Sequence, residues 1–358
     1  MLRSRYDIIV GDVRDIVGSI DEVHCVVTSP PYFRMKKYGD SSFEIGTEQD
    51  VDSYISCICD VFERIPLHPL GSIWVNIGDK RKDGFLMGIP ERFVISMEDR
   101  GFRRIDSVVW AKVEDHDDGT TEGNCMTEPA IGRLNDRGHE MMYRFSRVGP
   151  SEAWSDTCAV ALPRRNVDDI RYLPEELMSC HTSIEGRSLH NVWRTGMGQT
   201  KDGHFASFHP SLIERPIAMT CPVCVNPDGT LPRRIVEMVP YDEGRSSKRV
   251  FGKYSIVRED EDGELRQRAG RQDTGRAYVA KKPVTVGWER IDSGATPGIV
   301  LDPFSGRGTT GEVALKLGRN YIGVDLYEDY CEMSRASCER SISLMREKML
   351  NPWMEILG

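Results

Sequence analysis

The stretch from residue 299 to residue 325 restricts the fold of this chain more than any other. An apolar run at residues 299–302 predicts a strand, a glycine-containing turn follows, and residues 311–317 continue at helical spacing. A second apolar strand at residues 321–324 ends at Asp325. A strand, glycine loop, helix and strand, with an acidic residue about 20 positions after the loop, is typical of a nucleoside-cofactor site. The unit predicts an α/β fold, in which a mostly parallel, twisted sheet carries helices on both faces.

The loop of this unit has the sequence DPFSGRGTT at residues 302–310. It lacks the G-x-G-x-x-G spacing of dinucleotide sites, and no lysine follows it as in a P-loop. An adenosyl group without phosphates is therefore a better match than a dinucleotide or a triphosphate, and Asp325 is placed to accept both ribose hydroxyls. The candidate cofactor-binding residues of this unit are Asp302, Phe304, Gly306, Gly308, Thr309, Thr310 and Asp325.

A second motif is TSPPY at residues 28–32, directly after an apolar strand. Its two prolines end the strand, because neither can donate a ladder hydrogen bond and each fixes φ. The stiff loop offers the Ser29 hydroxyl, the Pro30 carbonyl and the aromatic face of Tyr32. Two acceptors can take the two hydrogens of an exocyclic amine while the tyrosine ring stacks on the base. Hydrogen bonds from both amine hydrogens draw the nitrogen lone pair out of conjugation, so that it can attack an electrophile. The alternative is a Pro-Pro turn with a packed tyrosine.

TSPPY followed much later by DPFSGRGTT resembles the S-adenosylmethionine-dependent DNA amino-methyltransferases. The order resembles their permuted β group, in which the target-amine motif precedes the cofactor motif. The family's usual FxGSGTT has serine at the position of Arg307. Further stretches that resemble the family in this order are VGD at 10–12, SIWVNIGD at 72–79, VVWAK at 108–112, RGHE at 137–140, NVW at 191–193 and HFASFHP at 204–210.

The resemblance implies a Rossmann-like methyltransferase fold, circularly permuted, with an inserted target-recognition region. It implies S-adenosyl-L-methionine as the cofactor and adds Asp12, Phe205 and Ser207 to the cofactor-binding residues. Asp12 is equally suited to capping the short helix expected after it. No metal is expected, because the sulfonium already activates the methyl group. The catalytic residues implied by the resemblance are Ser29, Pro30, Pro31 and Tyr32.

The resemblance also implies the substrate, an exocyclic amine in double-stranded DNA. Serine before the Pro-Pro pair is associated with N4 of cytosine, so we expect a site-specific N4-cytosine DNA methyltransferase. The base must be rotated out of the duplex, at a cost of a few kcal/mol. Two alternatives stay open, an N6-adenine DNA methyltransferase and an inactive DNA-binding protein with the same fold. A cognate restriction endonuclease is a candidate partner, and the protein is expected to be a monomer or a homodimer.

The motif order predicts how the chain is divided. A catalytic half comes first, a target-recognition segment with scattered arginines follows, and a basic, aromatic insert that suits a DNA surface separates the two parts of the cofactor-binding half. The expected ranges are 1–149 for the catalytic half, 150–200 for target recognition, 201–220 with 298–346 for the cofactor half, 221–297 for the insert and 347–358 for a C-terminal tail.

Local patterns predict strands at residues 72–77 and 102–110, a helix at residues 89–100 and an edge strand at residues 141–145. The acidic, glycine-bearing residues 114–123 predict a loop. Within the insert, Cys221 and Cys224 have the spacing of a zinc ribbon. No second cysteine pair follows, so the insert resembles a ribbon that has lost that pair. Zinc requires four ligands, and only upstream side chains such as Cys180, His181, His204 or His209 could complete the set.

Composition sets outer limits. None of the 358 residues belongs to an apolar run of the roughly 20 that a membrane helix requires, so no membrane segment is expected. Ten cysteines without regular spacing predict reduced thiols and a cytoplasmic protein. The net charge of -9 argues against nonspecific nucleic-acid binding over the whole surface, although it allows a locally basic cleft.

Overall fold

The structure is a computed structural model, and it describes residues 5–35, 39, 44–115, 121–123, 132, 138–160, 189–196, 209–240, 254–259, 265–270 and 281–350. The chain forms two compact units. The first consists of residues 1–160, 189–234 and 288–358, and the second of residues 161–188 and 235–287. Phe205, Ser207 and most of the expected target-recognition segment lie outside the described residues.

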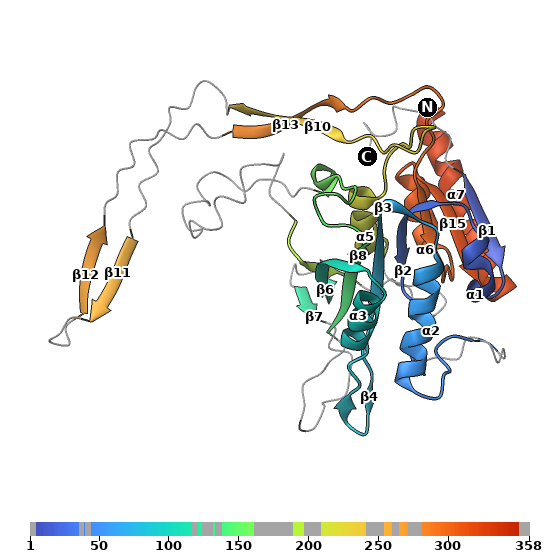
Figure 1. The fold of residues 1–358 in the computed structure, drawn as a ribbon, viewed down its shortest axis with the longest axis horizontal. Helices are drawn as coiled ribbons and strands as arrows, with labels where there is room; N and C mark the ends of the chain where they lie inside the picture. The colour runs from blue at the N-terminus through green and yellow to red at the C-terminus, as the bar shows by residue number, and fades with distance from the viewer. Residues whose placement is uncertain are drawn as a thin grey trace. The chain divides into compact units, whose positions relative to one another are not determined.

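The first unit contains a mixed sheet and the helices that cover it (Figure 1). The strands of the sheet are β1 (Tyr6–Val10), β2 (Val23–Thr28), β3 (Leu67–Ile77), β6 (Arg103–Asp115), β7 (Thr121–Gly123), β8 (His139–Ser146), β9 (Val192–Thr195), β14 (Ile299–Asp302) and β15 (Asn320–Asp325). The helices are α1 (Val13–Ile16), α2 (Val51–Arg64), α3 (Ile89–Asp99), α5 (Pro210–Thr220), α6 (Thr309–Lys316) and α7 (Glu328–Leu350), and a short hairpin joins β4 (Arg81–Lys82) to β5 (Phe85–Leu86).

The order of the strands brings distant parts of the chain together. In the described chain the nine-stranded sheet follows the path β1-β15-β14-β2-β3-β8-β6-β7, with β9 beside β6. Neighbours from β1 to β3 along this path are parallel, whereas β8 is antiparallel to both β3 and β6. β2 is buried at every position, as expected for a central parallel strand covered on both faces.

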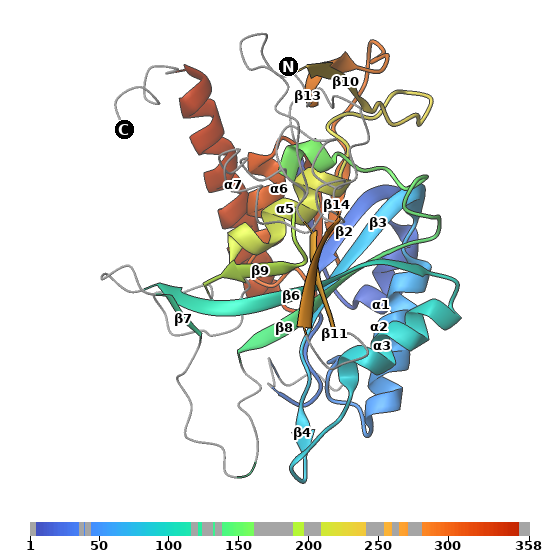
Figure 2. The same ribbon diagram turned by 90° about the vertical axis from the view of Figure 1, so that its left-hand side faces the viewer.

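Helices cover both faces of this sheet (Figure 2). One apolar core packs α1, α2 and α3 against side chains such as Val26, Ile73 and Phe145. The other packs α5, α6 and α7 against side chains such as Cys25 and Trp74. Successive residues of β2 and β3 thus serve opposite cores, because strand side chains alternate between the faces.

Two local predictions are wrong. Residues 141–145 do not form an edge strand, because β8 lies between β3 and β6. Residues 114–123 are not simply a loop, because β6 continues to Asp115 and pairs with β7. There the backbone pairing overrides the acidic composition. The strand and helix predicted at residues 72–77 and 89–100 are confirmed, with a longer strand than expected.

The insert contributes strands to the second unit. β10 (Arg234–Pro240) pairs with β13 (Lys281–Trp288), and β11 (Tyr254–Glu259) pairs antiparallel with β12 (Leu265–Gly270). The basic residues Arg245, Lys248 and Arg249 lie outside the described residues. None of the helices in the described chain combines the length and the apolar character that crossing a membrane requires.

Candidate active site

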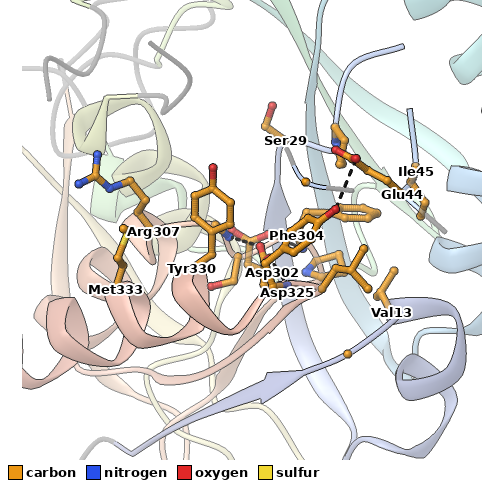
Figure 3. Close-up of a pocket in the computed structure, with 18 of the residues that line it drawn as sticks. Val13, Ser29, Glu44, Ile45, Asp302, Phe304, Arg307, Asp325, Tyr330 and Met333 are labelled. Atoms are coloured by element: carbon orange, nitrogen blue, oxygen red, sulfur yellow. Dashed lines mark hydrogen bonds between the residues drawn. The ribbon is translucent and has the colours of Figure 1, made fainter. Parts of the chain in front are cut away.

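A cavity of about 480 Å³ opens in the first unit where the parallel strands end (Figure 3). Its size lies within the range of pockets that bind small organic ligands. It is bounded by the segments that follow β1, β2, β14 and β15. Of the sequence-predicted site residues, those that line it are Asp12, Ser29, Pro31, Asp302, Phe304, Gly306, Thr309, Thr310 and Asp325.

The two sequence motifs meet because β14 and β2 are parallel neighbours. Val300 pairs with Cys25 and Leu301 with Val26, so both strands end at the same edge of the sheet. The Thr28 hydroxyl donates a hydrogen bond of 2.6 Å to Asp302 Oδ1 across 274 positions of sequence. Ligands of open α/β sheets bind at this edge, and the geometry therefore makes the cavity the candidate active site.

Asp302 joins the two loops. Its carboxylate accepts hydrogen bonds from the Phe304 amide at 3.0 Å and the Thr310 hydroxyl at 2.6 Å, besides the one from Thr28. Burial raises the pKa of this carboxyl to about 6, although these hydrogen bonds act in the opposite direction. Asp302 and Thr310 thus hold the cavity wall together, in addition to lining it.

Asp325 supports the glycine loop from the neighbouring strand. One carboxylate oxygen accepts the Gly306 amide at 2.8 Å, and the other accepts the Tyr327 amide at 3.1 Å. Burial raises the pKa of this carboxyl as well. Lone pairs remain on both oxygens, because each carboxylate oxygen can accept more than one hydrogen bond.

The two glycines of the loop have different surroundings. Gly306 has φ +50°, lines the cavity, and a Cβ added there would meet no atom within 4 Å. Gly308 has φ +84°, and a Cβ there would lie 2.5 Å from the Ser334 hydroxyl oxygen of α7. The left-handed φ favours glycine at both positions, and at Gly308 the packing against α7 additionally leaves no room for a Cβ, whereas Gly306 borders the open cavity.

The TSPPY loop is held in place by burial and by a hydrogen bond from α2. Pro30 is buried, and the Tyr54 hydroxyl of α2 donates to the Pro31 carbonyl at 2.8 Å. Ser29 faces the cavity, but Tyr32 is not among the residues that line it. The Tyr32 hydroxyl instead enters a polar network beside the cavity.

This network contains residues that the sequence had not marked as functional. The Tyr32 hydroxyl donates to Glu140 Oε2 at 2.6 Å, and Asn76 Nδ2 contacts both groups, at 2.8 and 2.7 Å. Lys112 forms a short ion pair with the other oxygen of Glu140. The three residues belong to the WVNIGD, VVWAK and RGHE stretches, so family resemblance gave a signal, but no local pattern predicts that they meet.

A protein-family model described as DNA methylase matches residues 23–336. The match includes both motif loops and every residue of the polar network. This chain belongs to the DNA methylase family.

Curated relatives agree with that assignment, and a solved structure shares the fold. The type II methyltransferase M.SmaI of Serratia marcescens is 22% identical over 362 residues, which cover 92% of this DNA methylase and 89% of the relative. M.XycI of Xanthomonas campestris pv. cyanopsidis is 26% identical over 227 residues, which cover 53% of this chain and 64% of the relative. The solved PvuII DNA methyltransferase, described as cytosine-N4-specific, aligns with a TM-score of 0.52 at 16% identity, over 98% of this chain and 94% of that one. The predicted Rossmann-like methyltransferase fold is confirmed.

The methyl donor of this DNA methylase family is S-adenosylmethionine, which confirms the predicted cofactor. The cavity fits such a group on two counts. Gly306 leaves bare backbone at the wall, and the lining includes three acidic side chains, Glu44, Asp302 and Asp325, which complement the positive charge of a sulfonium. Figure 3 shows these acidic side chains together with Phe304, which offers an aromatic face.

The position of Asp12 is compatible with both of its predicted roles. Its side chain caps α1 by accepting the Arg14 amide at 2.9 Å, and it also lines the cavity. The Arg14 guanidinium bonds to the same carboxylate and lowers its pKa. The cap is therefore established by geometry, while contact with the cofactor stays a prediction.

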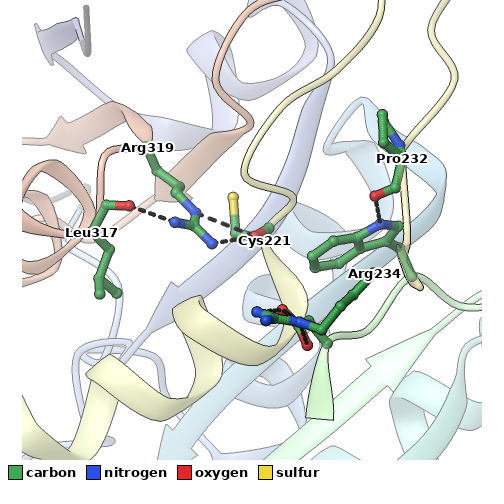
Figure 4. A network of polar contacts seen from close by, with 7 residues as sticks. Cys221, Pro232, Arg234, Leu317 and Arg319 are labelled. Atoms are coloured by element: carbon green, nitrogen blue, oxygen red, sulfur yellow. Dashed lines mark hydrogen bonds and ion pairs between the residues drawn. The ribbon is translucent and has the colours of Figure 1, made fainter. Parts of the chain in front are cut away.

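The Cys221–Cys224 segment is held by an arginine (Figure 4). Arg319 donates to the Cys221 carbonyl from Nε at 3.3 Å and from Nη2 at 3.1 Å. Burial raises the pKa of both thiols. Within the described part of the chain no three histidine, cysteine or acidic side chains are placed to hold a metal, and His209 instead caps α5. Cys180, His181 and His204 lie outside that part.

Proposed function

We propose that this DNA methylase transfers a methyl group from S-adenosylmethionine to the N4 amine of a cytosine rotated out of double-stranded DNA, at a specific site. The observation that carries the proposal is that Ser29 and Pro31 line the same cavity as Phe304 and Asp325. Methyl transfer requires the amine and the methyl group to be adjacent and in line. One cavity bounded by both motif loops can provide this arrangement.

Each loop has a distinct task in this proposal. Asp325 would accept the ribose hydroxyls and Phe304 would contact the adenine ring, with Gly306 allowing close approach. When bound, S-adenosylmethionine supplies an activated methyl group. Ser29 and the Pro30 carbonyl would accept the two amine hydrogens, and Tyr32 would stack on the base. No covalent nucleophile is needed, because proximity and orientation are the main requirements.

The choice of cytosine depends on the serine in TSPPY. Cytosine N4 and adenine N6 are both amines on a ring carbon next to a ring nitrogen, so an acceptor pair can serve either. Resemblance associates Ser29 with cytosine, and the family model covers N6 as well as N4 methylases. N6-adenine methylation is therefore the second candidate. The motif order further supports membership of the permuted β group.

Transfer of tritiated methyl groups to DNA tests the enzyme assignment, and mass spectrometry of the hydrolysed nucleosides tests the target. We expect N4-methylcytosine at one sequence context. A product containing only N6-methyladenine would refute the N4 assignment. DNA binding without any transfer, on DNA that contains all short sequence contexts, would favour the inactive DNA-binding alternative.

We also propose that residues 150–200 and the insert at residues 221–297 contact DNA, and that a restriction endonuclease shares the recognition site. The basic composition of the insert and the type II relatives support these points. Replacing Arg245, Lys248 and Arg249 by alanine should lower the slope of DNA affinity against salt by about one unit for each lost phosphate contact. An unchanged slope would place the insert off the DNA.

A further inference from the structure

We propose that Glu140 is a positioning residue that makes Ser29 an acceptor for the target amine, acting through the hydroxyl of Tyr32. The proposal rests on the proposed function and assigns a role to a residue that does not line the cavity. Its basis is the direction of each hydrogen bond from Glu140 to Ser29. Those directions follow from the number of hydrogens that each group carries.

Glu140 sets the direction of the hydrogen bonds at one end of the network, because an ionised carboxylate can accept hydrogen bonds but cannot donate them. Lys112 Nζ, Asn76 Nδ2 and the Tyr32 hydroxyl all donate to it. The side chains of Lys112 and Glu140 are only 14% and 15% exposed. A carboxylate with so little exposure to water depends on its partners, which here are an ammonium and two neutral donors.

The Tyr32 hydroxyl determines the direction of the next hydrogen bond, the one that joins it to Ser29. A phenol has a single hydrogen, and the 2.6 Å contact gives this hydrogen to Glu140. Burial and the nearby Glu140 raise the pKa of the phenol, so it keeps the hydrogen at neutral pH. Its oxygen can then only accept from its other neighbours, which are Asn76 Nδ2 at 2.8 Å and the Ser29 hydroxyl at 3.3 Å.

Ser29 therefore has its own hydrogen directed at Tyr32, and only its lone pairs are left for a ligand. At 3.3 Å this contact is longer than the roughly 2.5–3.0 Å of ordinary hydrogen bonds between hydroxyl groups, as is common for catalytic hydrogen bonds before the substrate is bound. An unconstrained serine can donate as well as accept, and would serve a carbonyl oxygen as readily as an amine. A serine that can only accept selects an amino base over the corresponding oxo base.

The packing around the network limits other arrangements of Tyr32. A Cβ added at Gly78 would lie 3.1 Å from Tyr32 Cε2 and 3.6 Å from Glu140 Cγ. The glycine after β3 thus leaves room for both side chains to lie side by side with little to spare. Ser29, at the end of β2, is one residue beyond the pair Thr28 and Val75 that aligns β2 with β3.

The test compares binding of an amino base with binding of an oxo base. DNA with cytosine or uracil at the target position is bound to wild-type protein and to Tyr32→Phe, with S-adenosylhomocysteine present so that no transfer occurs. The variant keeps the ring but frees the Ser29 hydrogen. The wild-type preference for cytosine should fall about tenfold in the variant, which corresponds to one hydrogen bond of typical strength. The cost of opening the mismatch cancels, because both proteins bind the same two DNAs.

A second measurement tests the role of Glu140. Glu140→Gln should slow single-turnover methyl transfer about tenfold in the wild-type background and by less than about twofold in Tyr32→Phe, because residues acting through one another are not additive. Glu98→Gln removes a carboxylate that pairs with Arg104 away from the cavity and should change neither rate. Thermal midpoints of all variants identify any loss of folding.

The outcomes separate this proposal from the proposed function. If wild-type protein methylates DNA but Tyr32→Phe keeps the full amino preference, Ser29 is not fixed as an acceptor and the proposal is wrong. Additive effects of the Glu140 and Tyr32 substitutions would equally overturn it. Absence of methyl transfer by the wild type would overturn the proposed function instead. If the product is N6-methyladenine, adenine and hypoxanthine replace cytosine and uracil in the same comparison.

Discussion

The cofactor loop and the TSPPY loop lie at neighbouring strand ends, yet they are held in different ways. In the cofactor loop, Asp325 accepts the amides of Gly306 and Tyr327, so backbone groups from one strand-loop-helix unit provide the contacts. Beside the TSPPY loop, Tyr32 bonds to Glu140 across 108 positions, and side chains from several strands provide the contacts. The contacts of Asp325 are therefore local in the chain, although Asp302 of the same loop also bonds to the distant Thr28. The network around Glu140 exists only after the sheet has formed.

This difference has a mechanistic consequence. Where backbone amides bind a carboxylate, as at Asp325, the only side chain whose substitution removes the contact is the carboxylate itself. A chain of side-chain hydrogen bonds is sensitive to each member, because every hydrogen is already assigned. Substitutions at the two sites should therefore separate cofactor binding from turnover.

The largest effects are expected for Asp325→Ala and Tyr32→Ala, compared as a pair. Asp325→Ala should weaken S-adenosylmethionine binding about 100-fold, because hydrogen bonds to a charged group contribute about 1.5 to 3 kcal/mol each. Tyr32→Ala should change that affinity by less than about threefold but lower turnover about 1,000-fold, through lost stacking and loss of the acceptor arrangement. Calorimetry measures the affinity and single-turnover assays the rate.

Equal loss of cofactor affinity in the two variants would contradict the division between the sites. Tyr54→Phe provides a matched control, since it removes only the hydroxyl that supports the Pro31 carbonyl. It should lower the rate modestly and leave cofactor affinity unchanged.

The two glycines of the cofactor loop offer a sharper comparison within one site. Gly308→Ala should lower the free energy of unfolding by about 3 to 4 kcal/mol, from overpacking against Ser334 and the positive φ. Gly306→Ala should cost only about 1 to 2 kcal/mol for its φ, since no atom lies near the added Cβ, but should weaken cofactor binding. Urea unfolding and calorimetry on both variants test this. Greater destabilisation by Gly306→Ala would show that helix packing does not determine the second glycine.

The same contrast explains what the sequence could predict. The strand, glycine loop, helix and Asp325 lie within one short stretch, so periodicity and turn residues suffice to locate them. The network around Glu140 cannot be found this way, because Asn76, Lys112 and Glu140 come from three strands whose pairing is not encoded locally. The antiparallel insertion of β8 between β3 and β6 brings Glu140 next to Asn76, and this is the strand that the sequence misplaced at an edge. The reason for Gly308 was also missed, because Ser334 belongs to a later helix.

Asp302 bonds to both loops, so its titration offers a test of how strongly they depend on each other. Its pKa is about 6 in the folded protein against the ordinary 3.8. The folded state therefore binds the proton more tightly than the unfolded state, and the contribution of this carboxyl to stability falls as pH rises from about 4 to about 6. In Asp302→Asn there is no proton to lose, and the side-chain oxygen can still accept from Thr28 and Phe304.

The stability of Asp302→Asn relative to wild type should consequently rise with pH, by no more than about 3 kcal/mol between pH 4 and pH 7, and then stay constant. Thr310 faces the new amide and can turn its hydrogen toward the Val27 carbonyl at 3.5 Å, which limits the cost of the substitution. Urea unfolding at several pH values between 4.5 and 7.5 measures the difference. Asp12→Asn is the matched control: Arg14 lowers the pKa of Asp12, so its contribution is lost only below pH 3.8 and its difference from wild type should be flat over this range. If the stability difference between Asp302→Asn and wild type were also independent of pH, the carboxyl that joins the two loops would not resist ionisation.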